Sequence, residues 1–184
     1  MTYRTANYAA FYLAEPFTES NLGAHRCPDF VYYNLLRAWK SNDDNFPFID
    51  AHQKTYNVRD NSCWQTLKSR LHQRLNLSKN IILFLSKNTK NSRALHEEIS
   101  YGIELDLPII IIYPDLQEII DIKNNNQFTF QVRDLWNRIP ILRDHMNKIL
   151  TLHIPLKKEI ISKALLDGRF VVGYSLNPAP YFYT

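Results

Sequence analysis

A helical pattern over residues 91–103 places two adjacent glutamates where one of them could do chemistry. Ser92 is a favourable N-cap, so we expect a helix from Ser92 to Leu105. At about 100° per residue, Glu97 points to solvent, whereas Glu98 lies on the shoulder of the apolar stripe. A partly desolvated carboxylate at a pocket rim can stabilise developing positive charge or transfer a proton. The residues alone leave a second interpretation open, a surface glutamate paired with a neighbouring charge.

Short apolar runs alternate with helical stretches along most of the chain, which is typical of a parallel sheet covered by helices. The predicted fold class is α/β, a flavodoxin-like three-layer domain with a five-stranded parallel sheet. We expect one domain over residues 1–168 and an aromatic tail over residues 169–184 that packs on it. The expected strands are residues 8–13, 46–49, 81–85, 108–113 and 150–154, and the expected long helices are residues 28–40, 62–75, 92–105 and 157–166.

Two helices carry expectations about which side chains are buried. In the helix over residues 28–40 we expect a buried stripe of Val31, Leu35, Leu36 and Trp39. In the helix over residues 62–75 the densest basic cluster of the chain, Lys68, Arg70 and Arg74, is expected to form a solvated face.

Composition excludes several function classes. Four glycines, none directly after a strand, do not supply the phosphate turn of a Rossmann unit or a P-loop. Two cysteines cannot form a disulfide framework, and the six scattered histidines show no metal-ligand spacing, so we expect no metal. The net charge of +4 without a dense basic run argues against nucleic acid. No apolar run approaches the ~20 residues that span a bilayer, and no secretory signal is visible, so we expect a cytoplasmic protein without a membrane partner.

The strand, loop and helix over Ile81–Leu85, Ser86–Ser92 and Leu95–Ile99 resemble a TIR domain and the TIR-like domain of bacterial Thoeris anti-phage systems. In TIR enzymes a glutamate on this helix carries NAD glycohydrolase activity, and Glu98 takes its place here, the residue that the helical-face argument also selects. The resemblance covers about residues 3–154, with further matching segments at residues 7–12, 30–36, 50–52 and 56–60. Many TIR enzymes carry a tryptophan early in this helix, and its place here must be taken by Trp64 or Tyr101 or stay empty.

The resemblance implies cleavage of the bond between nicotinamide and ribose in NAD, which is the substrate and not a cofactor. It also implies an ADP-ribose-derived signalling molecule, either a cyclic ADP-ribose isomer or a conjugate with free histidine, that activates a separate effector protein after a phage-derived trigger. The loop over residues 50–60 would fold over the substrate, and homo-oligomerisation is left open. Two other functions stay open, a non-enzymatic TIR-like adapter and a sensor that binds ADP-ribose without turnover.

Ligands in such folds bind at the carboxyl ends of the strands, so the residues there are candidates for substrate binding. Each of them could equally serve as a cap, a loop hydrogen bond or a surface charge. The candidates, with the aromatic residue on the helix of Glu98, are Tyr12, Glu15, Asp50, His52, Ser86, Arg93 and Tyr101.

Overall fold

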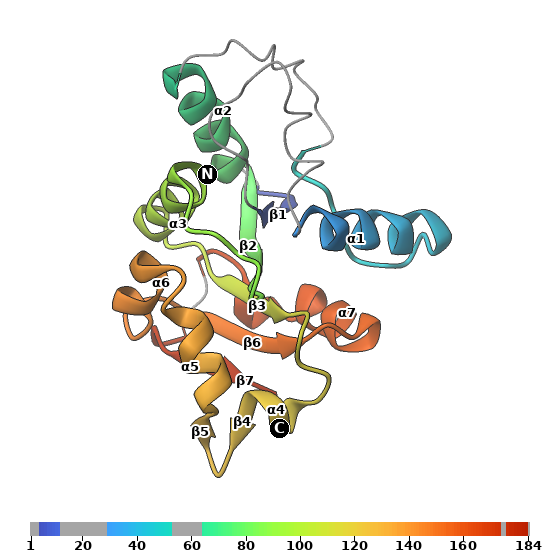
Figure 1. Ribbon diagram of the computed structural model, residues 1–184. Helices are drawn as coiled ribbons and strands as arrows, with labels where there is room; N and C mark the ends of the chain where they lie inside the picture. Colours follow the sequence, from blue (N-terminus) through green and yellow to red (C-terminus); the bar gives the residue numbers. More distant parts are fainter. Residues whose placement is uncertain (1–3, 12–28, 53–63, 174–175, 184) are drawn as a thin grey trace.

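The computed structural model describes residues 4–11, 29–52, 64–173 and 176–183, and its centre is a five-stranded parallel sheet (Figure 1). Every residue of β3 and β6, two of the three inner strands, is buried, as expected when helices cover both faces of a sheet. This confirms the predicted flavodoxin-like α/β fold. In spatial order the strands are β1 (Ala6–Ala10), β2 (Ser78–Phe84), β3 (Ile109–Tyr113), β6 (Thr151–Pro155) and β7 (Pro180–Phe182).

Two helical layers enclose the sheet (Figure 1). Because side chains alternate along a strand, Ile109 and Ile111 of β3 face one layer, and Ile110 and Ile112 face the other. The first layer contains α2 (Trp64–Asn76), α3 (Arg93–Glu104), α5 (Phe130–Trp136) and α6 (Pro140–His145). The second contains α1 (Phe30–Asn42), α7 (Lys158–Leu166) and the 3-10 helix Gly168–Phe170.

The set of strands differs from the prediction at both edges of the sheet. Residues 46–49 do not form a strand, and beside β1 there is a single bridge between Asn7 and Asp50. Phe46 and Phe48 are buried as a strand would require, but Pro47 has no N–H for a ladder, and the Asn7 side-chain amide donates to its carbonyl oxygen instead. The fifth strand is β7, which pairs with β6 at the opposite edge.

The buried stripe of α1 is also displaced from the prediction. Val31 is 60% exposed, whereas Phe30, Tyr33 and Leu36 are buried. The rings of Phe30 and Tyr33 pack against Phe11, with centroids 5.5 and 5.3 Å away. These aromatic contacts bury more apolar surface than Val31 could, and they set the rotation of the helix.

A small unit follows β3 and closes one end of the sheet. It contains α4 (Ile119–Ile122) and a hairpin of β4 (Lys123–Asn124) and β5 (Gln127–Phe128). Asn125 and Asn126 both have positive φ, at 48° and 61°, which suits the two central residues of a tight hairpin turn. The sequence signals only a polar loop there, and asparagine's tolerance of this backbone region allows the hairpin.

A chain of hydrogen bonds runs from α5 through the buried centre of the sheet to the end of α6. Trp136 Nε1 donates to the Tyr113 hydroxyl at 2.8 Å, and that hydroxyl lies 2.7 Å from Nδ1 of His153. Nε2 of His153 lies 2.9 Å from the Thr151 hydroxyl, which donates to Sδ of Met146 at 3.6 Å. Burial lowers the pKa of His153 to about 3, so its ring is neutral. The chain therefore couples β3, β6, α5 and the end of α6 through polar contacts inside an apolar core.

Within the described ranges, no helix combines the length and the apolar character needed to cross a bilayer.

Candidate active site around Glu98

Helix α3 lies unusually close to the sheet, and this brings Glu98 to β1. The Ser92 hydroxyl caps the helix by accepting from the Leu95 N–H at 3.0 Å, as the sequence predicts. A Cβ on Gly102 would lie 2.3 Å from Cδ1 of Ile81 on β2, so a glycine permits this close packing. The helix consequently turns Glu98 inward together with its apolar stripe.

Glu98 is more deeply buried than the sequence predicts, with only 1% of the residue exposed. The Tyr8 hydroxyl of β1 donates to its Oε1 at 2.6 Å. Its Oε2 is buried and has no hydrogen-bond partner among the described residues. A buried polar atom without a partner is unfavourable, and such atoms are concentrated at sites that bind something. One carboxylate oxygen is thus held by the protein while the other is available.

Burial has a large effect on the ionisation of this pair. It raises the pKa of Glu98 to about 8, against the smaller opposing effects of the Tyr8 hydrogen bond and the Arg74 charge. Burial and the neighbouring Glu98 likewise raise the pKa of Tyr8 well above its usual range. In this structure, Glu98 is therefore largely protonated at neutral pH.

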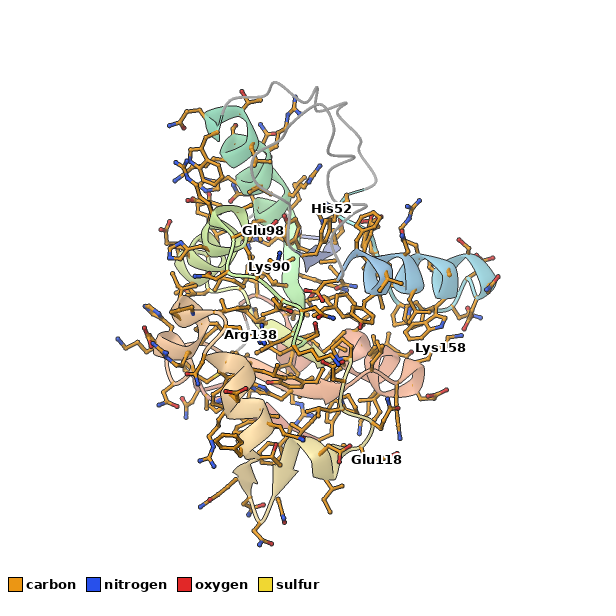
Figure 2. The ribbon with its side chains drawn as sticks, viewed as in Figure 1. His52, Lys90, Glu98, Glu118, Arg138 and Lys158 are labelled. Atoms are coloured by element: carbon orange, nitrogen blue, oxygen red, sulfur yellow. The ribbon has the colours of Figure 1, made fainter. Side chains whose placement is uncertain are left out.

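His52 and Glu98 both contact Tyr8 and lie near each other in Figure 2, and the tautomer of His52 follows from its hydrogen bonds. The two rings are stacked with centroids 4.8 Å apart. Nε2 lies 3.0 Å from the Ala9 carbonyl oxygen, which can only accept, so Nε2 carries the proton. Nδ1 is then an acceptor, and Nη1 of Arg74 donates to it at 3.1 Å. Burial, aided by Arg74, lowers the pKa of His52 to about 4, so the ring is neutral at physiological pH.

Asp50 fixes the turn that carries His52. Its Oδ1 accepts from the His52 backbone N–H at 2.7 Å, and its Oδ2 accepts from the Tyr33 hydroxyl of α1 at 2.6 Å. The structure thus brings Glu98, Asp50 and His52 into one network, although they come from distant parts of the chain. Asp50 and His52, expected to contact substrate, are engaged by protein groups in this state.

Comparison with known protein families identifies the family of the chain. The family model described as Thoeris protein ThsB, TIR-like domain, matches residues 8–119. The chain belongs to this family. The match contains Tyr8, Asp50, His52, Arg74 and Glu98 and ends before the β4–β5 hairpin. A TIR-like domain of a Thoeris protein fits a role in anti-phage defence.

Glu97, the neighbour of Glu98, has a different environment in the TIR-like domain. Its Oε1 lies 2.8 Å from Nζ of Lys68 and 2.7 Å from Nε2 of His72, both on α2. Partial burial alone would raise the pKa of Glu97, but these two partners outweigh it and lower the pKa. The helical-face argument is thus confirmed for Glu98, which alone of the two faces the sheet. The prediction that Glu97 points to solvent is wrong, because its side chain is only 19% exposed and lies against the two α2 partners.

Ser86 holds a loop of the TIR-like domain together instead of facing an open site. It is fully buried, and its hydroxyl donates to Oδ1 of Asp29 at 3.1 Å. The Thr89 hydroxyl donates to Oδ2 of the same carboxylate at 2.8 Å. Burial raises the pKa of Asp29, while these two hydrogen bonds oppose the rise. Of the two roles that the sequence left open for Ser86, the structure shows the loop hydrogen bond, which fixes the segment leading into α3.

The remaining candidates lie along the α2–α3 surface or outside the described residues. The Arg93 guanidinium lies 4.0 Å above the Trp64 ring, a cation–π contact between the starts of α2 and α3. Tyr101 stacks on His72, with ring centroids 3.5 Å apart. Neither arrangement puts an aromatic ring on Glu98. Tyr12, Glu15 and residues 53–60 fall outside the part of the chain that the structure describes.

Sequence reasoning missed Tyr8, Tyr33 and Arg74 as members of the network. It also assigned Arg74 to a solvated face, which is wrong, because Arg74 is only partly exposed and bonds to His52. A usable signal was its position directly before Leu75, at the edge of the buried stripe of α2.

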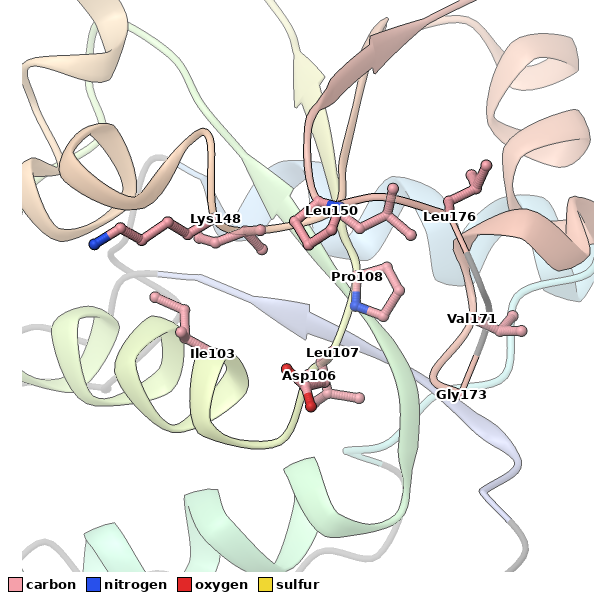
Figure 3. Close-up of a pocket in the computed structure, with 11 residues that line it drawn as sticks. Ile103, Asp106, Leu107, Pro108, Lys148, Leu150, Val171, Gly173 and Leu176 are labelled. Carbon is pink, nitrogen blue, oxygen red and sulfur yellow. The ribbon is translucent and has the colours of Figure 1, made fainter.

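Several cavities in the described part of the TIR-like domain are distinct from Glu98, and two of them bear on the site's surroundings. One, of about 320 Å³, lies beyond the carboxyl end of α3 at the amino ends of β3 and β6 (Figure 3). Its lining is mostly apolar and includes Leu107, Pro108 and Leu150. The other, of about 220 Å³, lies between α1 and residues 48–50, where Asp50 and Arg37 line it. The second cavity touches the network through Asp50.

The raised pKa of Glu98 predicts a pH dependence of stability. Above its ordinary pKa of 4.5 the carboxyl ionises in the unfolded chain but stays protonated in the folded one until about pH 8. The contribution of Glu98 to the free energy of unfolding should therefore fall as pH rises across this interval, by at most about 5 kcal/mol, and then level off. The lowered pKa values of His52 and His153 act in the opposite direction below about pH 6.5, so the Glu98 contribution is the difference between wild type and Glu98→Gln. Glu98→Gln should remove this fall, whereas Glu97→Gln should keep it, since the pKa of Glu97 is lowered. Urea unfolding at a series of pH values measures the difference, and parallel curves for wild type and Glu98→Gln would contradict the assignment.

Proposed function

We propose that this TIR-like domain cleaves the bond between nicotinamide and ribose in NAD, with Glu98 as the catalytic residue. The observation that carries the proposal is the asymmetric environment of the buried carboxylate: Tyr8 holds Oε1, and Oε2 has no partner among the described residues. Such an atom can accept a hydrogen bond from a ribose hydroxyl or lie beside the carbon that becomes cationic.

The chemistry needs one carboxylate and no metal-bound water. The ring nitrogen of nicotinamide is already positively charged in NAD, so the leaving group departs as a neutral molecule without a general acid. The ribose that remains resembles an oxocarbenium ion in the transition state, as in glycoside cleavage. A carboxylate next to this carbon lowers the energy of the transition state more than that of the substrate.

The substrate itself favours the ionised form of Glu98. In the structure without substrate the carboxyl is largely neutral because it is buried without a full counter-charge. A cationic nicotinamide ring close to the carboxyl stabilises the carboxylate form, because an opposite charge lowers the pKa of an acid. Binding of NAD at Glu98 would therefore produce the charge state that the reaction requires.

The fate of the ribosyl group decides the biological product. Water would give ADP-ribose, the adenine of the same molecule would give a cyclic isomer, and free histidine would give a conjugate. We propose that a product of one of the last two kinds activates a separate effector protein, with a phage-derived trigger starting the reaction.

The test is an incubation of the purified protein with NAD, alone, with free histidine, and with extract from phage-infected cells. Nicotinamide release is followed by chromatography, and the second product is identified from its mass. We expect release of nicotinamide in at least one condition, with a product other than ADP-ribose. A binding isotherm with ADP-ribose is recorded in parallel. Binding of ADP-ribose without release of nicotinamide in any condition would indicate a sensor instead of an enzyme. The absence of both binding and release would favour an adapter.

A further inference from the structure

Arg74 reaches the site from α2, and its partner differs from that of Lys68 on the same helix. Lys68, which lies on the same helix, pairs with Glu97 on the α2–α3 surface. Arg74 instead donates from Nη1 to Nδ1 of His52. His52 stacks on Tyr8 with ring centroids 4.8 Å apart, and the Tyr8 hydroxyl donates to Glu98, so Arg74, His52, Tyr8 and Glu98 are in contact in series. The charge of Arg74 accordingly acts to lower the pKa of both Tyr8 and Glu98.

The placement of this guanidinium depends on His52 being neutral. The Nε2 proton of His52 is committed to the Ala9 carbonyl oxygen, and only the lone pair on Nδ1 can accept from Arg74. A proton on Nδ1 would put two donors and two positive charges against each other. Asp50 in turn holds the backbone of His52. Asp50, His52 and Arg74 therefore form an ordered series, each positioning the next.

We propose that Arg74 is a positioning residue for NAD cleavage: held by neutral His52, its guanidinium keeps a positive charge beside the Tyr8–Glu98 pair, so that Glu98 can carry a negative charge when the ribose becomes cationic. This inference rests on the proposed function of Glu98. Arg74 acts through Glu98 and does not need to touch the reacting atoms.

The charged and titratable groups around Glu98 support this division of roles. Tyr8 faces the carboxylate from β1 and Arg74 acts on it from α2, while His52 and Asp50 lie behind Tyr8 on the segment that follows α1. Tyr8 donates a hydrogen bond but stays neutral, since burial raises its pKa. Among these described groups, Arg74 is the one that supplies positive charge.

The direct test is the ionisation of Glu98, measured by ¹³C NMR on protein with labelled glutamate carboxyl groups and assigned by the signal missing in Glu98→Gln. In Arg74→Met the midpoint of the Glu98 titration should rise by about one pH unit or more, because an opposite charge has been removed. Arg74→Lys keeps the charge and should restore much of the wild-type midpoint. Lys68→Met is the matched control, since it removes a cation of the same helix that faces Glu97, and it should leave the Glu98 midpoint unchanged.

A substitution of His52 tests its role separately. His52→Leu removes the acceptor for Arg74 without removing the arginine, and it should move the Glu98 midpoint in the same direction as Arg74→Met. The double variant should shift the midpoint no further than Arg74→Met alone, because both changes remove one arrangement. If Arg74→Met does not fold, His52→Leu still decides the matter.

The pH profile of nicotinamide release connects the titration to catalysis. In Arg74→Met the rising limb of kcat against pH should move upward with the Glu98 midpoint, and Arg74→Lys should bring it back. A merely structural role of Arg74 would lower the rate without moving the limb. An unchanged Glu98 titration in folded Arg74→Met overturns the inference even if wild type cleaves NAD. Conversely, a shifted titration in a protein that never cleaves NAD refutes the proposed function and leaves the effect of Arg74 on Glu98 established.

Discussion

Replacing Glu98 with glutamine is expected to lower the rate of nicotinamide release from NAD by about 100-fold or more, the scale seen when a single electrostatic contact to a transition state is removed. Glutamine has nearly the same volume and keeps an oxygen that can accept from the Tyr8 hydroxyl, so the packing of α3 against β1 is preserved. What the variant loses is the negative charge that stabilises the cationic ribose. Binding of NAD should change much less than kcat, because the charge matters most in the transition state.

Glu97→Gln is the matched control for this prediction. The two glutamates are adjacent on α3, but Glu97 pairs with Lys68 and His72 on the surface of the domain. Its loss should change nicotinamide release by less than about twofold and stability by less than about 1 kcal/mol, as is typical of a partly exposed ion pair. Initial rates at saturating NAD, with circular dichroism to confirm folding, measure both variants. Equal loss of activity in the two variants would refute the special role of Glu98.

The choice of Glu98 over Glu97 could be made from the sequence because it depends only on local geometry. A helix turns about 100° per residue, so the stripe formed by Leu95, Ile99 and Gly102 fixes which neighbour faces the sheet. The depth of burial could not be predicted in the same way. It follows from the close approach of α3 to β2 at Gly102, which depends on where Ile81 lies in the sheet.

At the two edges of the sheet, the local sequence pattern does not predict the strands correctly. Residues 46–49 are all apolar, and Phe46 and Phe48 are buried as they would be in a strand, but Pro47 cannot donate to a neighbouring strand. Conversely, β7 is only three residues long and follows an irregular segment rich in aromatic residues. Its position is set by pairing with β6, a contact between residues about 30 apart that no local signal encodes.

The groups around Glu98 were harder to predict than Glu98 itself. Tyr8 reads as an ordinary strand residue and Arg74 as one of several cations on a helix. Their roles arise only when β1, α2 and the turn at Asp50 come together, through contacts that span up to 90 residues of sequence. Sequence spacing therefore identifies a carboxylate that faces inward, while its electrostatic environment depends on tertiary structure.

A second large effect is expected from the hydrogen-bond chain in the core. The two ends of this chain fix which group donates and which accepts at every step. The Trp136 indole can only donate and the Met146 sulfur can only accept. The Tyr113 hydroxyl must therefore donate to Nδ1 of His153, and the Nε2–H of His153 must donate to the Thr151 hydroxyl. Each inner member accepts one hydrogen bond and donates one, so the loss of any member leaves both of its neighbours without a partner.

Tyr113→Phe removes the central link and should lower the free energy of unfolding by roughly 2–4 kcal/mol. The ring of phenylalanine fills the same space, so the loss is polar: the Trp136 N–H loses its acceptor and Nδ1 of His153 loses its donor. Both are at least partly buried, and a polar group left unpaired in the core destabilises the folded state more than the mean value of one hydrogen bond.

Urea unfolding of Tyr113→Phe beside Tyr101→Phe measures this effect. The Tyr101 hydroxyl exchanges hydrogen bonds with Asn76 at an exposed position, and water can replace them, so that variant should lie within about 0.5 kcal/mol of wild type. ¹⁵N NMR of the histidine rings provides an independent check, since wild-type His153 should be the Nε2–H tautomer throughout the neutral range. A loss in Tyr113→Phe no greater than in Tyr101→Phe would show that the hydrogen-bond chain does not stabilise the core, and a His153 proton on Nδ1 would show that it does not run in the stated direction.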